Sequence, residues 1–397
     1  TYLVRTGILR VFGANLRRFL ARSLGTRPGA AAAGMGVTAL VQSSTATALI
    51  VASFVGQGLV SLPMALAVML GADVGSSVMA VVFSLDLSWL SPLLIFVGVV
   101  LFISHQASQA GRYGRVLIGL GLMLLALRLV AETTAIMVQS PAVQALLLSL
   151  SSDVLLEITV GAALAIAAYS SLAIVLLTAT LAASGAIPMD VALGLTLGAN
   201  LGSGLLGLVA MSPPPVEVRH VPMGNLVFKC AGVVLVAPLV GLWLRHAGPL
   251  LGHPAAVVVG FHLGFNILIA LLFIGLTGAG GRQVPPWMPR PDKNLMAGRP
   301  HHLDPTALAT PSLAISCAAR EALHQADVVE TMLVGMMRVI EENDQRLSQD
   351  LRKMDDTVDQ LYSAIKYYLT KISREALGEE ESRRWTDIIS FTINMEQ

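Results

Sequence analysis

Residues 42–48 read QSSTATA and are followed, after an apolar stretch, by GADVGS at residues 71–76. The same pattern returns later in the chain, as YSSLA at residues 169–173 and GANLGS at residues 198–203, and both parts are displaced by the same distance along the sequence. Similarity at a fixed spacing is the signature of internal repeats. Two polar, glycine-rich breaks inside apolar sequence are typical of secondary transporters. The sequence therefore predicts a membrane protein that is built from two repeats.

Charged residues are scarce and unevenly distributed. Of the 397 residues only 13% are charged and 54% are hydrophobic, with a mean hydropathy of +0.71; soluble domains carry about 25% charged residues. We therefore expect a membrane domain over residues 1–281, a proline-rich linker over 282–304 and a soluble helical domain over 305–397. Two cysteines are too few for a disulfide framework. No nucleic-acid partner is expected.

Two apolar stretches, 29–57 and 155–185, are too long for one membrane crossing. Each has about 30 residues, so a straight helix would extend about 45 Å, whereas about 20 residues cross the hydrocarbon. Each carries the Ser-Ser pair near its middle. A re-entrant helical hairpin fits better, because broken backbone at membrane depth is tolerated where it lines a cavity. The repeats are then expected over residues 29–138 and 155–280.

The placement of basic residues favours an inverted arrangement of these repeats. If both stretches return to the side from which they entered, Arg112, Arg115 and the C-terminal domain face the cytoplasm. If both cross fully, Arg112 and Arg115 move outside and the loop 139–154, which lacks lysine and arginine, moves inside. The positive-inside rule favours the hairpins. The expected fold is an all-α polytopic membrane protein with two inverted repeats, each containing a re-entrant helical hairpin, and a C-terminal soluble helical bundle.

Polar groups at the two breaks form the candidate binding site. The N–H groups at the N-terminal end of a broken helix attract anions, while carbonyl, hydroxyl and amide oxygens suit a hard cation such as sodium. An acid inside a span is costly and functional by default, so Asp73 is expected to line the cation or substrate path. The candidate residues are Gln42, Ser43, Ser44, Thr45, Thr47, Asp73, Tyr169, Ser170, Ser171 and Asn200.

Several polar residues have a structural explanation that competes with a functional one. The glycines of the two later motifs also suit close packing of membrane helices. Arg128 lies four residues before Glu132 on the same helix face, which favours a structural ion pair. Lys229 lies about nine residues into its span and is expected to snorkel toward the cytoplasm. The weaker site candidates are Ser76, Ser203, Asn225, Asn266 and Arg128.

The doubled motif resembles the type II sodium/phosphate cotransporter family, in particular its bacterial members with a PhoU-like domain. The resemblance covers nearly the whole chain. It implies a multi-pass protein of the bacterial inner membrane that couples sodium entry to phosphate uptake by alternating access, with its C-terminal domain in the cytoplasm. By position, residues 42–45 would form the first half-site, and Ser170 and Ser171 the second. The resemblance also implies a homodimer; no organic cofactor is expected.

Two residues depart from the family pattern. Tyr169 stands where glutamine is usual, which removes an amide carbonyl and an NH₂ donor. Asp73 stands where asparagine is common, and its carboxylate would strengthen cation binding or bring proton coupling. Two alternatives stay open: a membrane-anchored regulator of phosphate signalling without transport, and a transporter of another oxyanion such as sulfate. An enzyme is not expected, because no nucleophile–base pair or metal-ligand grouping converges in the membrane part.

The C-terminal part has the apolar spacing of helices over residues 306–345 and 347–376, which predicts two long helices of a bundle. An acidic run resembles the helical motif of PhoU-like proteins, in which Asp355 and Asp359 would share a metal-binding face. A solvated acidic face is the alternative. The resemblance implies a regulatory role through a cytoplasmic partner. We expect this domain to be incomplete, because the chain ends at Gln397 without a helix cap.

Overall fold

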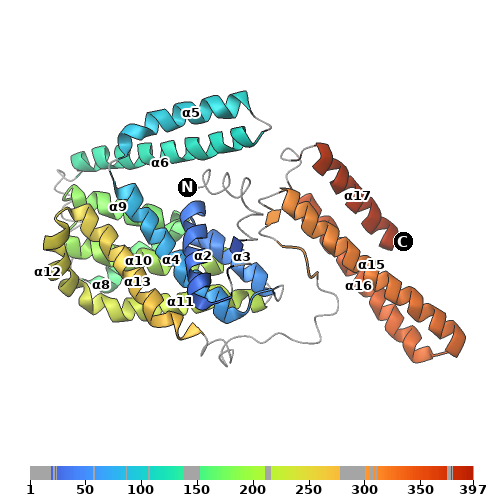
Figure 1. The fold of residues 1–397 in the computed structure, drawn as a ribbon. Coiled ribbons are helices and arrows are strands. Elements are labelled where there is room, and N and C mark those ends of the chain that lie inside the picture. Colours follow the sequence, from blue (N-terminus) through green and yellow to red (C-terminus); the bar gives the residue numbers. More distant parts are fainter. Residues whose placement is uncertain are drawn as a thin grey trace. The chain divides into compact units, whose positions relative to one another are not determined.

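The computed structural model describes residues 19–20, 23, 25–56, 59–85, 87–105, 108–137, 153–210, 216–277, 300–304, 307–308, 311–372, 377 and 379–396. These residues are helical or lie in turns, and no strand occurs among them (Figure 1). Most of the expected linker 282–304 and of the loop 139–154 lies outside the described residues. The chain divides into two compact units, Thr1–Pro289 and Arg290–Gln397.

The first unit contains two sets of three helices with matching boundaries. The first set is α2 (Arg27–Val41), α3 (Ser44–Gly56) and α4 (Leu62–Ser84), and the second is α8 (Val154–Ala167), α9 (Ser171–Ala183) and α10 (Met189–Val209). The offset between the first residues of counterpart helices is identical for all three pairs, and it equals the offset between the two sequence motifs. In both sets the helix is interrupted at the Ser-Ser motif, and a second short helix begins directly after the interruption. The helices therefore follow the repeat that the sequence predicts.

Glycines bring the first and third helix of each set into backbone contact. A Cβ placed on Gly71 of α4 would lie 1.8 Å from the carbonyl oxygen of Ala31, and one on Gly198 of α10 would lie 2.1 Å from that of Ile158. Real Cβ atoms do not approach oxygen so closely, so only glycine fits at these contacts. Gly198 and Ile158 are the counterparts of Gly71 and Ala31 in the second repeat. The packing of the two sets is therefore duplicated along with the sequence.

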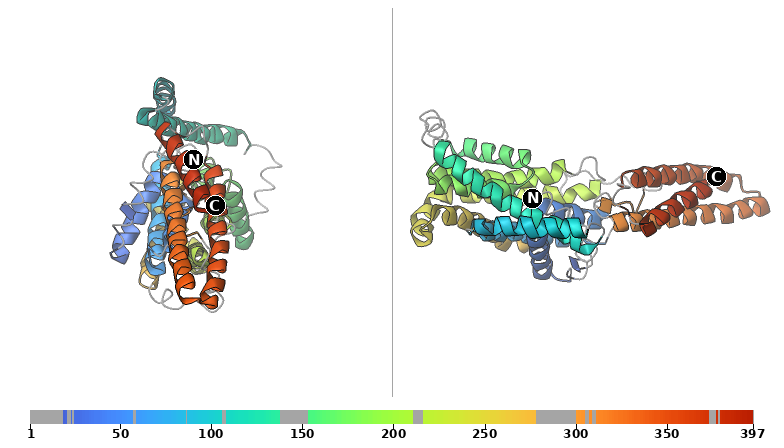
Figure 2. Two further views of the ribbon diagram at one scale, coloured as in Figure 1. Left: turned by 90° about the vertical axis from the view of Figure 1, so that its right-hand side faces the viewer. Right: turned by 90° about the horizontal axis from the view of Figure 1, so that it is seen from above.

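The other helices of this unit are α5 (Ser91–Ser104), α6 (Gln109–Met137), α11 (Val216–Val236), α12 (Val240–Leu251) and α13 (Pro254–Ile274), with short 3₁₀ turns at Ser88–Leu90 and Ala237–Leu239. Helices α5 and α6 lie side by side (Figure 2), and the Ser91 hydroxyl donates to the carbonyl of Gly121 at 2.8 Å. The α5 helix has 14 residues, which is fewer than the about 20 that a full crossing of the hydrocarbon requires.

Long apolar helices give this unit the character of a membrane domain. Among the described residues, four helices are long and apolar enough to cross a bilayer: Leu62–Ser84, Met189–Val209, Arg219–Leu251 and Pro254–Ile274. Large apolar side chains such as Phe96, Leu250 and Leu271 are exposed on the surface. An apolar surface of this kind is costly in water and favourable against lipid tails.

The second unit contains α15 (Pro311–Glu342), α16 (Gln345–Thr370) and α17 (Glu379–Glu396). Its core includes Ile315, Ile365, Leu369 and Ile388. Helices α15 and α16 confirm the two helices that the sequence predicts. The third helix, α17, was not predicted from the sequence, and its Trp385 ring N–H donates to the carbonyl of Leu369 at 3.1 Å.

Candidate functional site

The two helix breaks, at Gln42 and at Tyr169, have the same backbone geometry. Gln42 and Tyr169 adopt positive φ angles of 57° and 50°, in the left-handed region that non-glycine residues rarely occupy. One residue later, the Ser43 hydroxyl accepts a hydrogen bond from the N–H of Ala46 at 3.2 Å, and the Ser170 hydroxyl accepts one from the N–H of Ala173 at 3.2 Å. Each serine thus caps the helix that follows it. Backbone strain of this kind persists where the surrounding fold enforces it, often at ligand sites.

Both breaks face one cavity of about 310 Å³. Its lining is formed by Gln42, Ser43, Ser44, Thr45, Ser76, Ala168, Tyr169, Ser170, Ser171 and Leu172. Eight of these ten residues are among the predicted site residues, and none of the ten carries a formal charge. The N-terminal ends of α3 and α9 both contribute to this lining, so the free N–H groups and the positive dipole ends of two helices meet at one place. The cavity therefore combines hydroxyl and N–H donors in the way that an oxyanion requires.

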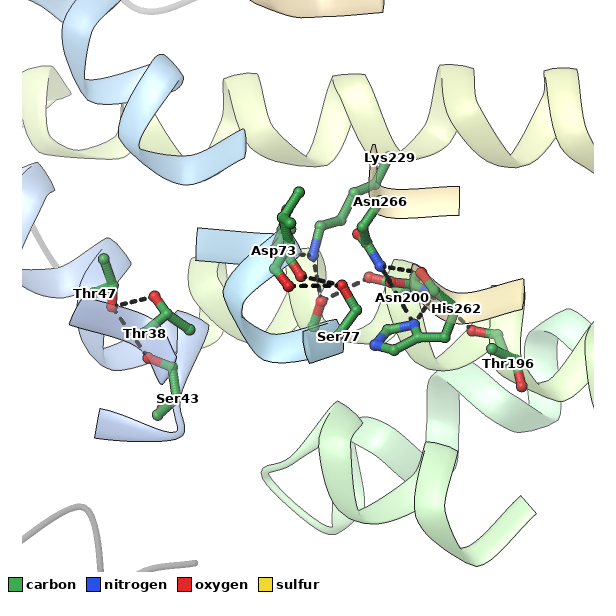
Figure 3. A network of polar contacts seen from close by, with 12 residues as sticks. Thr38, Ser43, Thr47, Asp73, Ser77, Thr196, Asn200, Lys229, His262 and Asn266 are labelled. Atoms are coloured by element: carbon green, nitrogen blue, oxygen red, sulfur yellow. Dashed lines mark hydrogen bonds and ion pairs between the residues drawn. The ribbon is translucent and has the colours of Figure 1, made fainter. Parts of the chain in front are cut away.

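Asp73 lies outside that lining and forms a buried ion pair (Figure 3). Its carboxylate Oδ1 is 2.9 Å from Nζ of Lys229, which comes from α11. The Lys229 ammonium also donates to the hydroxyl of Ser203 on α10. Asp73 is 7% exposed and Lys229 only 2%. The expected snorkelling of Lys229 is therefore wrong: its ammonium points into the protein because a carboxylate and a hydroxyl receive it there.

Asn200, which corresponds in position to Asp73, lies in a neutral network instead. Its amide nitrogen is 2.9 Å from Nδ1 of His262 and 3.0 Å from the carbonyl of Thr196, and its amide oxygen accepts from Asn266 at 3.1 Å (Figure 3). All four residues are buried. Thr196 was not predicted from the sequence. His262 was a weak site candidate of the sequence, together with Asn266 four residues later in the same apolar span.

A second, much smaller cavity of about 10 Å³ lies beside the first one. Ser44 and Thr45 line both cavities, while Ser203 and Asn225 line only the smaller one. The Asn225 amide oxygen is buried and accepts no hydrogen bond from the residues that the structure describes. A space of this size holds about one water molecule or one small ion.

Two other predicted residues have structural partners. Thr47 is fully buried and its hydroxyl lies 2.7 Å from that of Thr38, a residue that the sequence did not suggest. Arg128 pairs with Glu132 at 2.8 Å, which confirms the predicted ion pair, and both side chains are exposed. Neither Thr47 nor Arg128 lines the main cavity.

In the second unit, Asp355 and Asp359 are exposed on α16. Within the described residues, no three His, Cys, Asp or Glu side chains are placed to hold a metal together. Metal binding by this pair therefore stays a prediction.

A helical membrane unit in which two matched helix breaks line one uncharged polar cavity is typical of a secondary transporter. Residues 1–132 match the family described as Na+/Pi-cotransporter, and residues 323–397 match the PhoU domain. The chain belongs to the Na+/Pi-cotransporter family and carries a PhoU domain, which confirms the resemblance seen in the sequence.

Several bacterial relatives match the chain. A protein of Escherichia coli (strain K12), "Putative inorganic phosphate export protein YjbB", is 47% identical over 400 residues, which is 100% of this chain and 73% of that protein. The protein of the same name in Salmonella typhimurium is 46% identical over the same shares. "Uncharacterized protein YqeW" of Bacillus subtilis is 24% identical over 60% of this chain and 78% of its own length. No solved structure matches the chain.

The expected direction of transport, sodium-coupled phosphate uptake, is wrong. The relatives that cover this whole chain are named for phosphate export. The physical reason is that a binding site reached by alternating access would work in either direction, so the residues of a binding motif carry no information on the direction of transport. The gradients of phosphate and of the coupling ions decide the net direction of transport, and the Ser-Ser motifs do not encode these gradients.

Proposed function

We propose that this protein moves inorganic phosphate outward across a bacterial inner membrane by alternating access. The observation that carries the proposal is the cavity between the two breaks, where the N-terminal ends of α3 and α9 and the hydroxyls of Ser43, Ser44 and Ser170 meet. A tetrahedral oxyanion accepts hydrogen bonds on all sides, which suits donors that come from two directions. The names of the relatives support phosphate as the substrate and export as the direction.

The lengths of the broken helices support re-entrant hairpins. Helix α2 has 15 residues and α3 has 13, or about 22 Å and 20 Å at 1.5 Å per residue, whereas the hydrocarbon core is about 30 Å thick. Each helix is too short to cross alone. We therefore propose that α2–α3 and α8–α9 each return to their side of entry, that the two repeats are inverted, and that the PhoU domain lies in the cytoplasm.

Sodium is the coupling ion that the family description suggests. We propose that a sodium ion would bind in the small cavity, where the buried amide oxygen of Asn225 accepts no hydrogen bond from any residue that the structure describes. Export limits how many such ions travel with phosphate. At an inside-negative potential each outward positive charge costs about 2.3 kcal/mol per 100 mV, and each tenfold inward gradient adds about 1.4 kcal/mol. A phosphate exporter therefore gains from carrying few sodium ions outward.

The test is release of radiolabelled phosphate from proteoliposomes that contain the purified 397-residue chain. We expect saturable release that sulfate does not inhibit and that the double variant Ser43→Ala/Ser170→Ala abolishes. The variant Ser84→Ala is the matched control, because its hydroxyl donates to the carbonyl of Val81 in its own helix and does not line the cavity. Inhibition by sulfate would indicate another oxyanion as the substrate. Absence of release from correctly folded protein would favour a membrane-anchored regulator.

Deletion of residues 300–397 tests the role of the PhoU domain. We expect the remaining membrane unit to retain some release, since the whole cavity lining comes from residues 42–172. Loss of regulation with retained release would support a regulatory domain that binds a cytoplasmic partner. The homodimer implied by the family is tested on the same purified protein by its mass in detergent.

A further inference from the structure

We infer that the ammonium group of Lys229 is a built-in cation that occupies a coupling-ion position between the two repeats. The inference deepens the proposed function and rests on it, because a coupling ion has a meaning only in a transporter. Lys229 would then set how many cations travel with each phosphate. It would act as a specificity-determining residue for the driving ion, while the phosphate cavity itself remains uncharged.

The surroundings of the ammonium are those of a hard cation. Its nitrogen lies 2.9 Å from a carboxylate oxygen of Asp73 and donates to the hydroxyl of Ser203. Carboxylate and hydroxyl oxygens are also ligands of alkali and alkaline-earth cations. Asp73 belongs to α4 of the first repeat and Ser203 to α10 of the second, so the charge is held between the two halves of the membrane unit. A transported cation that couples the movement of both halves would have contacts with both.

The second repeat shows that packing does not require a charge at this position. Asn200 has the place of Asp73 in the second repeat, with the same glycine contacts around it, yet its partners are the neutral groups of His262, Asn266 and Thr196. Burying two charges costs desolvation that a neutral or apolar pair avoids, so a buried ion pair is weak evidence for a stabilising role. The ion pair of Asp73 and Lys229 in the first repeat therefore points to a role in transport.

The position of the pair places it beside the binding cavities. Ser76, one helical turn after Asp73 on α4, lines the phosphate cavity. Ser203, which accepts a hydrogen bond from Lys229, lines the small cavity together with Ser44 and Thr45. The ammonium balances the charge of the Asp73 carboxylate, as a sodium ion would, so the pair places no net negative charge beside a bound oxyanion. Because the lysine is covalently attached, it returns with the protein and does not leave with the phosphate.

The test replaces Lys229 and follows cation dependence. In Lys229→Met the Asp73 carboxylate is left with an empty position, and we expect a sodium ion to enter it. Phosphate release should then increase at least about tenfold between low and high sodium in the variant, with one more sodium ion per phosphate than in the wild type. The double variant Asp73→Asn/Lys229→Met, which has neither charge, should lose this added dependence. Lys353→Met is the matched control, since Lys353 pairs with Asp350 at 2.9 Å on the exposed face of α16.

A second readout separates this inference from the proposed function. Binding of radioactive sodium to the purified protein in detergent requires no transport, and Lys229→Met should bind one more ion than the wild type. If Lys229→Met does not fold, Lys229→Gln keeps a donor toward Asp73 without the charge and is measured in its place. Equal sodium binding and equal sodium dependence in the wild type and in the folded variant would overturn the inference. Failure of all forms to move phosphate, with extra sodium bound by the variant, would overturn the proposed function and the coupling role that rests on it, while supporting the assignment of the ammonium to a cation position.

Discussion

The two repeats share a backbone and differ in their electrostatics. Their helices begin at matching positions, and their glycine contacts join matching residues. At the helix breaks, Gln42 and Tyr169 have φ angles of 57° and 50°. Yet Asp73 pairs with an ammonium, whereas Asn200 lies among neutral amide, imidazole and carbonyl groups. The two repeats therefore share their helix packing. They differ in the buried polar group, which is an ion pair in the first repeat and a set of neutral hydrogen bonds in the second. The following changes test that division.

The largest effect is expected from breaking the charged centre. Asp73→Asn leaves the Lys229 ammonium buried and unpaired, so the free energy of unfolding should fall by about 3–5 kcal/mol. Asn200→Ala removes only neutral hydrogen bonds and should cost about 1–3 kcal/mol. Thermal unfolding of both purified variants in one detergent gives the comparison. Equal losses would mean that the pair is not desolvated as the structure indicates.

The next largest effect is expected at the glycine contacts, and here the repeats should behave alike. Gly71→Ala and Gly198→Ala each force a methyl group against a backbone carbonyl and should cost about 1–3 kcal/mol or more, because two helices must separate. Gly36→Ala is the control: no atom lies within 4 Å of its added Cβ, and the change should be neutral or stabilising by up to about 1 kcal/mol. A large difference between Gly71→Ala and Gly198→Ala in unfolding temperature would contradict the shared packing.

The two capping serines should give smaller losses of stability with large losses of transport. Ser43→Ala and Ser170→Ala each remove one helix cap, which costs about 1 kcal/mol. Each also removes a donor from the phosphate cavity, so phosphate release should fall at least about tenfold. Separate measurement of unfolding temperature and of release rate distinguishes the two effects. Full release by either variant would remove that serine from the binding site.

The smallest effect is expected from exchanging the residues at the breaks. Tyr169→Gln gives the second repeat the residue of the first at a matching left-handed position, so stability should change by less than about 1 kcal/mol. Because Tyr169 is 64% exposed and lines the cavity, the change should alter the phosphate concentration at half-maximal release more than the maximal rate. A folded variant without any release would show that the phenol is required for binding.

The sequence predicted those features that depend on local order. The position of the Ser-Ser pairs predicted the breaks, the constant offset between the motifs predicted the second set of helices, and Arg128 and Glu132 formed the ion pair expected from a four-residue spacing. The partners of Asp73 and Asn200 could not be predicted in this way. Lys229 and His262 are far from them along the chain, and only the packing of α11 and α13 brings them together. The direction of transport depends on gradients and was not contained in the motif.

The glycine contacts also limit how the protein can change shape. With backbone against backbone at Gly34, Gly71 and Gly75, α2 cannot slide along α4 by even one residue, about 1.5 Å, without driving a side chain into a carbonyl. The same restriction holds α8 to α10. We therefore expect each pair to move as one rigid unit. The deformation during a transport cycle must be concentrated between these units, so their internal distances should stay constant while the cavity opens to one side or the other.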